Sequence, residues 1–178
     1  MNRILKTLLT ILAVLVVLIV GAYGYLGGFR SITIEEKQMG PFHFAYREMV
    51  GTDFSKISEI TTALDAELRD KGVTTLHPFD LFNPEGGGEI GFVVSESEAE
   101  QLLNSSIRIK TIPMQQCMVA TFPWKNPMSY MVGFMKVDPA LEAHRKKNGY
   151  RKTWAATRHD GDTITYLQPI VKELIAPQ

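Results

Sequence analysis

One uncharged stretch near the N-terminus constrains this chain more than any other feature. The residues from Thr7 to Phe29 include no charged side chain, and the part from Leu8 to Val20 is almost entirely leucine, isoleucine and valine. About 20 apolar residues span a hydrocarbon core of roughly 30 Å, because each helical residue rises about 1.5 Å. We therefore expect residues 1–29 to be an N-terminal membrane anchor that contacts the bilayer through residues 7–29, and residues 30–178 to form one domain.

A cleaved secretory signal is the alternative interpretation of this stretch. Arg3 and Lys6 form a basic N-terminal region, and Ala22-Tyr23-Gly24 loosely matches a small-residue cleavage site. The apolar core of a signal usually has about 7 to 15 residues, whereas this run continues to Phe29, which favours an uncleaved single-pass anchor. The two basic residues predict a cytoplasmic N-terminus, with the domain outside the cytoplasm.

The charge of residues 30–178 argues against a nucleic-acid partner. This region holds all 19 acidic residues of the chain and all but Arg3 and Lys6 of its 19 basic residues, so it is slightly acidic. Domains that bind nucleic acids usually carry a strongly basic face. The densest basic cluster, from Arg145 to Lys152, follows a predicted helix, where cations complement the negative end of the helix dipole.

Neither the single cysteine nor the histidines indicate a metal, a cofactor or a catalytic centre. Cys117 excludes an internal disulfide and lies in an apolar context typical of a small buried residue. His43, His77, His144 and His159 are scattered, without a close pair and without a cysteine or acidic partner at ligand spacing. We therefore predict no metal site, no cofactor and no catalytic residue.

Hydrophobic periodicity predicts the same order of elements twice in the domain. In the first half we expect strands at 32–34, 42–47, 74–77 and 89–94, a helix between an N-cap at Asp53 and a C-cap at Gly72, and a turn at 83–88. In the second half we expect strands at 107–111, 116–122, 151–159 and 163–167, and one kinked helix or two helices from Met128 to Lys147.

These elements predict an α+β fold. Two pseudo-twofold duplicated β-α-β-β modules would form an antiparallel sheet with two helices on one side and a groove between the halves. The Gly-rich turn at 83–88 lacks the Gly-Lys-Ser/Thr ending of a phosphate loop, so a hairpin connection is the better interpretation.

Several segments resemble the GyrI-like effector-binding domain of the SOUL/haem-binding-like superfamily. They are Val119-Ala120-Thr121-Phe122-Pro123-Trp124, Val137-Asp138-Pro139-Ala140-Leu141 and Phe82-Asn83-Pro84. Together with the preceding apolar segment, they are similar to the single-pass membrane branch of the family, which includes an ER-phagy receptor. The resemblance covers nearly the whole chain, although its motifs are short.

The resemblance implies a groove, lined by aromatic residues, that binds a small amphipathic, aromatic or cationic ligand. Some relatives hydrolyse strained cyclopropane compounds. The family commonly places a glutamate, in a Glu-x-Tyr pattern, on the strand after the second helix, but here Trp154 or Ala155 stands near that place. Trp154 can attract a cation through its ring but cannot transfer a proton at neutral pH, so both cation pairing and catalysis are in doubt.

Aromatic side chains with polar atoms are the best candidates for contacts with a ligand. The candidates for ligand binding are Tyr46, Glu48, Phe122, Trp124, Tyr130, Trp154 and Tyr166. Glu48 or Glu89 would replace the missing glutamate if either points into the groove. The alternatives are that Phe122, Tyr130 and Tyr166 fill the core and that both glutamates lie at exposed edges.

A membrane-anchored module that binds its ligand without changing it is the favoured function. The first alternative is a hydrolase of reactive small molecules, with Glu48, Glu89 or a tyrosine as the proton donor. The second is a membrane-tethered adaptor for proteins, which the short C-terminal segment after the last predicted strand disfavours. A haem carrier like some relatives, with His43 or His77 as the axial ligand, is less favoured still.

Overall fold

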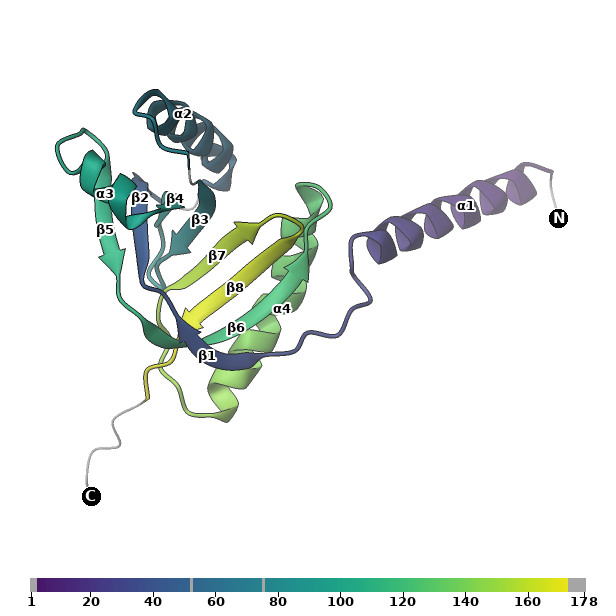
Figure 1. The fold of residues 1–178 in the computed structure, drawn as a ribbon. Coiled ribbons are helices and arrows are strands. Elements are labelled where there is room, and N and C mark those ends of the chain that lie inside the picture. Colours follow the sequence, from purple (N-terminus) through teal and green to yellow (C-terminus); the bar gives the residue numbers. More distant parts are fainter. Residues whose placement is uncertain (1–2, 52, 75, 173–178) are drawn as a thin grey trace, which may run out of the picture.

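The computed structural model describes residues 3–51, 53–74 and 76–172 (Figure 1). It consists of one N-terminal helix that stands apart and an α+β domain built on a curled antiparallel sheet (Figure 1). The helices are α1 (Arg3–Tyr25), α2 (Ile57–Asp70), α3 (Glu96–Leu102) and α4 (Met128–Lys147). The strands are β1 (Glu35–Met39), β2 (Phe42–Met49), β3 (His77–Phe82), β4 (Gly88–Val94), β5 (Arg108–Ile112), β6 (Gln115–Pro123), β7 (Ala155–Asp160) and β8 (Thr163–Pro169).

The strand order is β1-β6-β8-β7-β3-β4-β2-β5, and every neighbouring pair is antiparallel. The β3–β7 pair joins the two sides of the sheet at its centre. Two strands cross between the sides, because β1 pairs with β6 and β5 pairs with β2. The predicted fold class and antiparallel sheet are confirmed, while the internal duplication stays a prediction.

Both faces of the sheet are buried. On β2, Phe44 belongs to a cluster on the face without helices, whereas the next residue, Ala45, packs with α2 and α3. On β6, Val119 belongs to the first cluster and Met118 packs with α4. Because successive strand residues point to opposite faces, α2, α3 and α4 all cover one face, and the other face curls over its own apolar side chains.

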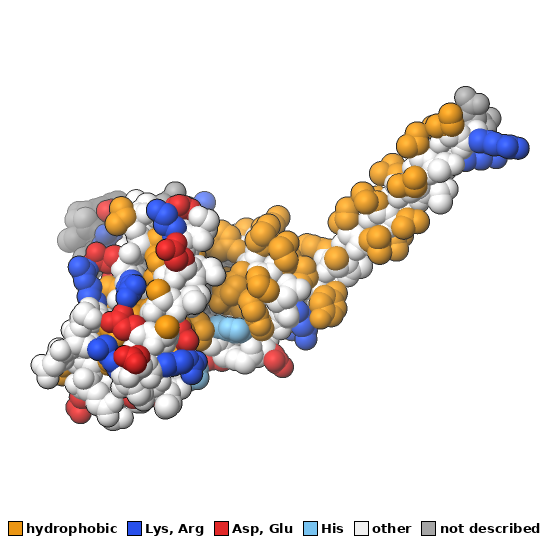
Figure 2. Space-filling view, turned by 90° about the horizontal axis from the view of Figure 1, so that it is seen from above, with side chains coloured by type: hydrophobic (Ala, Val, Ile, Leu, Met, Phe, Trp, Pro, Cys, Tyr) orange, Lys and Arg blue, Asp and Glu red, His pale blue; other side chains and the backbone are white. Residues whose placement is uncertain are grey.

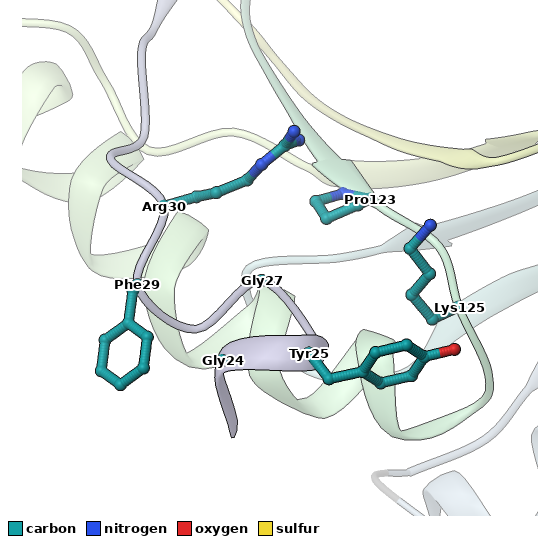
Figure 3. Close-up of a pocket in the computed structure, with 7 residues that line it drawn as sticks. All are labelled: Gly24, Tyr25, Gly27, Phe29, Arg30, Pro123 and Lys125. Carbon is teal, nitrogen blue, oxygen red and sulfur yellow. The ribbon is translucent and has the colours of Figure 1, made fainter. Parts of the chain in front are cut away.

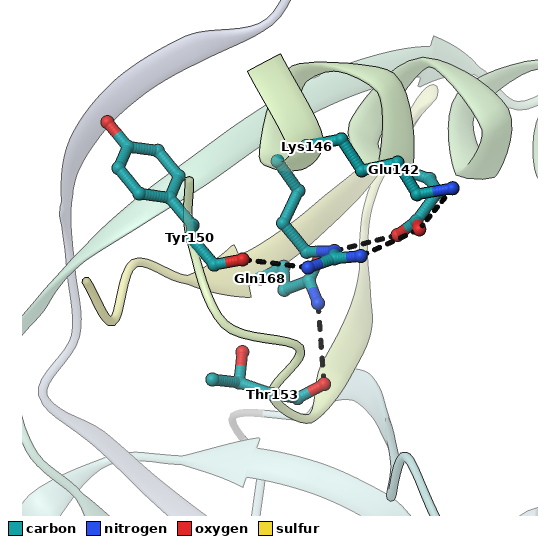
Figure 4. A network of polar contacts seen from close by, with 6 residues as sticks. Glu142, Lys146, Tyr150, Thr153 and Gln168 are labelled. Carbon is teal, nitrogen blue, oxygen red and sulfur yellow. Dashed lines mark hydrogen bonds and ion pairs between the residues drawn. The ribbon is translucent and has the colours of Figure 1, made fainter. Parts of the chain in front are cut away.

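The helix over Met128–Lys147 has the predicted bounds and is one helix, with Pro139 inside it. The side chain of Asn126 accepts a hydrogen bond from the backbone N–H of Met128 at 2.9 Å. At the other end, the Arg145 guanidinium donates to Glu142 and, at 2.7 Å, to the Tyr150 carbonyl (Figure 4). The second bond ties the helix to the segment that leads to β7. These contacts orient α4 against the sheet.

The first side of the sheet differs from the prediction in two elements. The strand β3 covers His77–Phe82 instead of 74–77, because the Glu98 carboxylate accepts the Thr74 N–H at 2.8 Å and thereby replaces a strand partner. Helix α3 was not predicted. Ser95 and Glu98 form a capping box at its start, which is a signal that the sequence does contain.

Several predicted boundaries also shift. A 3₁₀ turn over Phe54–Lys56 precedes α2, and Asp53 accepts hydrogen bonds from Ser55 instead of capping the α-helix. Residues 32–34 lie outside any strand, because Ile32 and Ile34 pack against the α4 cluster before β1 begins. Strand β7 begins at Ala155 instead of residue 151, since the Arg151 N–H bonds to the Val171 carbonyl.

Helix α1 is long and apolar enough to cross a membrane, and a signal sequence near the N-terminus has these properties too. None of its residues is buried. The turn after it packs against the domain: Leu26 contacts the α4 cluster, and Gly27 and Gly28 are buried. The Lys136 ammonium on α4 donates to the carbonyls of Gly28 and Arg30. Figure 3 shows this turn beside Pro123.

Candidate functional site

The structure divides the predicted ligand-binding residues between the two faces of the sheet. Tyr46 lies on the face without helices, stacked on Phe44 with ring centroids 5.3 Å apart and with the Lys110 ammonium 5.1 Å above its ring. Trp154 packs against the same cluster. Glu48, two residues after Tyr46 on β2, is exposed and forms an ion pair with Arg108. These three predicted residues do not join the aromatic residues around α4.

The alternative carboxylate Glu89 also lies away from α4. It forms an ion pair with Lys110, whose ammonium is the one above Tyr46. Both glutamates that were considered as replacements for the family's glutamate therefore have a basic partner at the edge of the sheet. Neither glutamate is therefore an unpaired carboxylate that could balance the charge of a cationic ligand.

Three rings form a cluster at the start of α4. The Trp124 ring lies 5.2 Å from Tyr130 and 4.5 Å from His159, and the rings of Tyr130 and His159 are 6.4 Å apart. The backbone N–H of Trp124 donates to the backbone carbonyl of Asp162 at 2.7 Å, which fixes the β6–α4 loop beside the β7–β8 turn. Trp124 and Tyr130 were predicted as site residues, but His159 was not.

Tyr166 and Phe122 complete this cluster beneath α4. Both are buried, and the helix approaches them closely at Gly133, where an added Cβ would lie 2.3 Å from Tyr166 Oη and 3.0 Å from Phe122. Burial raises the pKa of Tyr166, and the neighbouring Tyr130 raises it further. Tyr166 is therefore a neutral phenol that can donate a hydrogen bond.

Asp80, on the central strand β3, adds a carboxyl group to this face. It is paired in register with Thr157 on β7, which is paired in turn with Tyr166 on β8. Directly opposed residues of antiparallel strands share a face, so Asp80 lies on the face that carries the helices. Burial raises the pKa of Tyr130, and the charge of Asp80 raises it further, which places the carboxyl group near this phenol.

Desolvation alone raises the pKa of Asp80 to about 7. The side chain of Asp80 has no hydrogen bond or ion pair within the described part of the chain. Sequence reasoning missed this residue, because it placed the strand at 74–77. The alternation Phe79-Asp80-Leu81, with both apolar neighbours buried on the other face, is the signal that could have found it.

Two further polar atoms near this carboxyl group are unpaired. His159 Nε2 and Tyr166 Oη are buried without a hydrogen-bond partner among the described residues. Most buried polar groups in folded proteins are paired, so unpaired ones point to a strained or ligand-binding site. A carboxylate, two free polar atoms and aromatic walls can bind an organic cation and orient its polar groups.

Nothing in the described ranges indicates a metal centre, since no group of three or more His, Cys, Asp or Glu side chains is placed to hold an ion. His77 Nδ1 lies 3.3 Å from an Asp160 carboxylate oxygen, and His43 Nδ1 lies 3.3 Å from the Thr111 hydroxyl. These two histidines, considered as haem ligands, thus have ordinary polar partners.

No family model and no curated protein matches this sequence. Solved structures do share its fold. The C-terminal domain of EcmrR has a TM-score of 0.61 at 14% identity, covering 80% of this chain and 99% of that chain. SAV2435, solved bound to tetraphenylphosphonium, has a TM-score of 0.56 at 10% identity, covering 78% of this chain and 94% of that one.

The EcmrR chain in a complex with DNA gives a TM-score of 0.63 at 14% identity, covering 94% of this chain and 69% of that one. Identities this low show a shared fold alone. These neighbours are consistent with the predicted resemblance to the GyrI-like effector-binding domain, and membership of that family stays a prediction. The similarity to the ER-phagy receptor branch has no support in these comparisons and stays a prediction.

Proposed function

We propose that this protein is a membrane-anchored module that binds a lipophilic organic cation between β3 and α4, without catalysing a reaction. The observation that carries the proposal is the Asp80 carboxyl group, which is desolvated, lacks a partner among the described residues and lies near Tyr130. A desolvated carboxylate without a partner destabilises a fold, so a residue of this kind usually serves a function.

The chemistry around Asp80 favours a cation over an anion or a neutral ligand. A cation would restore the charge balance that burial removes, and the rings of Trp124 and Tyr130 attract positive charge through their faces. Tetraphenylphosphonium, which SAV2435 binds on the same fold, is a cation of this class. Of the seven residues predicted from the sequence, Phe122, Trp124, Tyr130 and Tyr166 belong to the proposed site.

Helix α1 supports the anchoring part of the proposal. None of its residues is buried by the rest of the protein, as expected for a helix in lipid. Arg3 and Lys6 precede the apolar run, so we place the N-terminus in the cytoplasm and the domain outside it. The mirrored strand order on the two sides of β3–β7 supports an internal duplication, with the ligand near the centre of the sheet.

Titration of the full chain with tetraphenylphosphonium tests the binding site. The variant Trp154→Phe leaves Trp124 as the only tryptophan, so quenching of its fluorescence reports the aromatic cluster. In this background, Asp80→Asn should weaken binding at least tenfold, which is about 1.4 kcal/mol. Glu48→Gln is the matched control, because it removes a carboxylate from the opposite face. Equal affinities in the two variants would refute the site.

Binding should also depend on pH in a defined direction. A cation prefers ionised Asp80, whose pKa is raised to about 7, so affinity should increase as the pH rises through 7. By linkage, the bound cation lowers this pKa, and binding near pH 7 should release protons. Calorimetric titrations in two buffers with different ionisation enthalpies measure this release. Asp80→Asn should abolish it.

One observation favours hydrolysis of a reactive small molecule as a second candidate function. A carboxyl group with a pKa near 7 can act as an acid or base at neutral pH, and Asp80 has this property. Glu48 and Glu89, the acids first considered, are ion-paired on the other face. Water addition to strained electrophiles, followed by mass spectrometry and lost in Asp80→Asn, would establish this function. The adaptor role and the absence of a nucleic-acid partner stay predictions.

A further inference from the structure

We infer that the outer face of the first half of α4 lies in the interfacial region of the bilayer that holds α1. This inference rests on the anchoring part of the proposed function and adds a second membrane contact to it. The contact is defined by four exposed side chains on α4, and we call it the Met-Phe face. Its members are Met128, Met131, Phe134 and Met135.

The Met-Phe face is unusual for a helix exposed to water. Its side chains are 51%, 58%, 55% and 70% exposed, respectively. Helices on a protein surface normally place polar residues opposite their buried side. At about 100° per residue, the Met-Phe face lies opposite the side where Ser129, Val132 and Gly133 are buried against the sheet. The first half of α4 is thus apolar on both sides.

The polarity of α4 changes along its length. Beyond Asp138 the helix carries Glu142, Arg145, Lys146 and Lys147, as a helix in water does. The change is the one expected if the start of the helix touches lipid and its end projects away. A helix that was apolar along its whole length would not show this change of polarity.

The junction with α1 fixes the Met-Phe face close to the membrane end of the anchor. Lys136, on the same half of α4, donates to the carbonyls of Gly28 and Arg30, directly after α1. Gly27 is buried, and an added Cβ there would lie 2.8 Å from Pro123. The domain is therefore joined to the anchor by a packed turn and not by a free linker.

Residues around the junction have the chemistry of a membrane interface. A hollow at the junction is lined by the exposed aromatic residues Tyr25 and Phe29 and by the basic residues Arg30 and Lys125 (Figure 3). Aromatic rings and basic groups are favoured at the level of lipid headgroups. Figure 2 shows hydrophobic side chains gathered between the charge-rich part of the domain and α1. A bilayer surface is thus the occupant that this face fits.

The Met-Phe face also borders the proposed binding site. Phe134 and Tyr130 are four residues apart on α4, so their side chains are neighbours on the helix surface. Tyr130 belongs to the aromatic cluster near Asp80. A lipophilic cation dissolved in the bilayer would therefore reach the site along apolar side chains without crossing bulk water.

Spin labels on single cysteines test this contact in the full chain. The buried Cys117 is replaced by alanine, and cysteine is introduced by Met131→Cys or Met135→Cys. The matched controls are Lys146→Cys, at the charged end of the same helix, and Leu103→Cys, an exposed apolar position after α3. Each labelled protein is placed in vesicles of phosphatidylcholine with a minor share of phosphatidylglycerol.

We expect the labels at 131 and 135 to be severalfold more accessible to oxygen, relative to a water-soluble nickel complex, than the labels at 146 and 103. Equal accessibility at all four positions in protein that floats with the vesicles would overturn this inference and leave the anchor intact. Failure of the protein to float with the vesicles would overturn both the contact of the Met-Phe face and the membrane anchor. Dipolar broadening that disappears on dilution with unlabelled chain would assign the face to a second copy instead. Tetraphenylphosphonium binding by the same samples tests the binding site separately.

Discussion

The two helix-covered regions of the sheet differ in how completely their side chains are satisfied. Under α2 and α3, aliphatic residues such as Leu64 and Leu68 fill the core, and Glu67 on α2 accepts hydrogen bonds from Arg47 and Ser106. Under α4, aromatic rings such as Phe122 and Tyr166 join the aliphatic core, and His159 Nε2 and Tyr166 Oη have no hydrogen-bond partner among the described residues. The polar groups of the first region thus stabilise the fold, whereas the second region is where we propose that a ligand binds.

Two acidic residues, the buried Glu98 and the half-buried Asp80, show this difference most clearly. Glu98, on α3, accepts hydrogen bonds from the Ser95 N–H at 3.0 Å, the Ser95 hydroxyl at 2.6 Å and the Thr74 N–H at 2.8 Å. Asp80 has the same chemistry but no such partner among the described residues. A carboxylate with complete hydrogen bonds is structural, while one without them is a candidate for function.

The largest expected effect is on the aliphatic region. Leu68→Ala removes a fully buried side chain and should lower the free energy of unfolding by about 2–5 kcal/mol, because it leaves a cavity. Urea unfolding of the full chain in detergent micelles measures this loss. The affinity for tetraphenylphosphonium should stay unchanged in folded protein, and a parallel loss of affinity would break the division between the two regions. Val50→Ala, at an exposed position, is the control.

Asp80 and Glu98 should respond to neutralisation with opposite signs. The pKa of Asp80 is raised to about 7 in the folded state, so ionising this group destabilises the folded state. The contribution of protonated Asp80 to stability is therefore present at low pH and is lost as the pH rises through 7. Asp80→Asn should therefore stabilise the protein above pH 7, by at most about 4 kcal/mol, with little effect near pH 4.

Glu98→Gln is the matched variant, and it should destabilise the protein, because the amide cannot accept the same set of hydrogen bonds. Unfolding midpoints of both variants at several pH values give the comparison. A destabilised Asp80→Asn protein at pH 8 would mean that Asp80 has a structural role, as Glu98 has.

The close approach of α4 to the sheet provides a smaller test. Gly133→Ala places a Cβ against Tyr166 Oη and should destabilise the fold by about 1–3 kcal/mol, although alanine favours helix. Adding Tyr166→Phe removes the oxygen, so the double variant should recover part of this loss. Thermal unfolding of the four combinations measures the coupling. Additive effects would show that the two residues do not meet.

The smallest effect concerns the start of α3. Ser95→Ala removes one side of the capping box and should lower stability by about 1 kcal/mol. Because α3 lies in the aliphatic region, tetraphenylphosphonium binding should not change. Calorimetric unfolding with and without the ligand would show whether the cap and the site are independent.

The sequence predicted long periodic elements well and short ones poorly. The bounds of α4 are as predicted, because apolar residues and breakers mark both ends, while α3 was missed because its seven residues give too short a pattern. Misplacing β3 hid Asp80. The prediction also grouped Tyr46 and Trp154 with Trp124, because both faces of this sheet are buried and alternation alone cannot tell one face from the other.

The crossed pairing of β1 with β6 has a consequence for how the chain acquires its shape. Glu35 on β1 pairs with Val119 on β6, and Phe42 on β2 pairs with Ile112 on β5, so both β1 and β2 must await a segment that is synthesised much later. Contacts between remote parts of a chain slow folding. Strand β1 would thus remain an unpaired edge strand until β6 has been synthesised, and neither side of the sheet can mature alone.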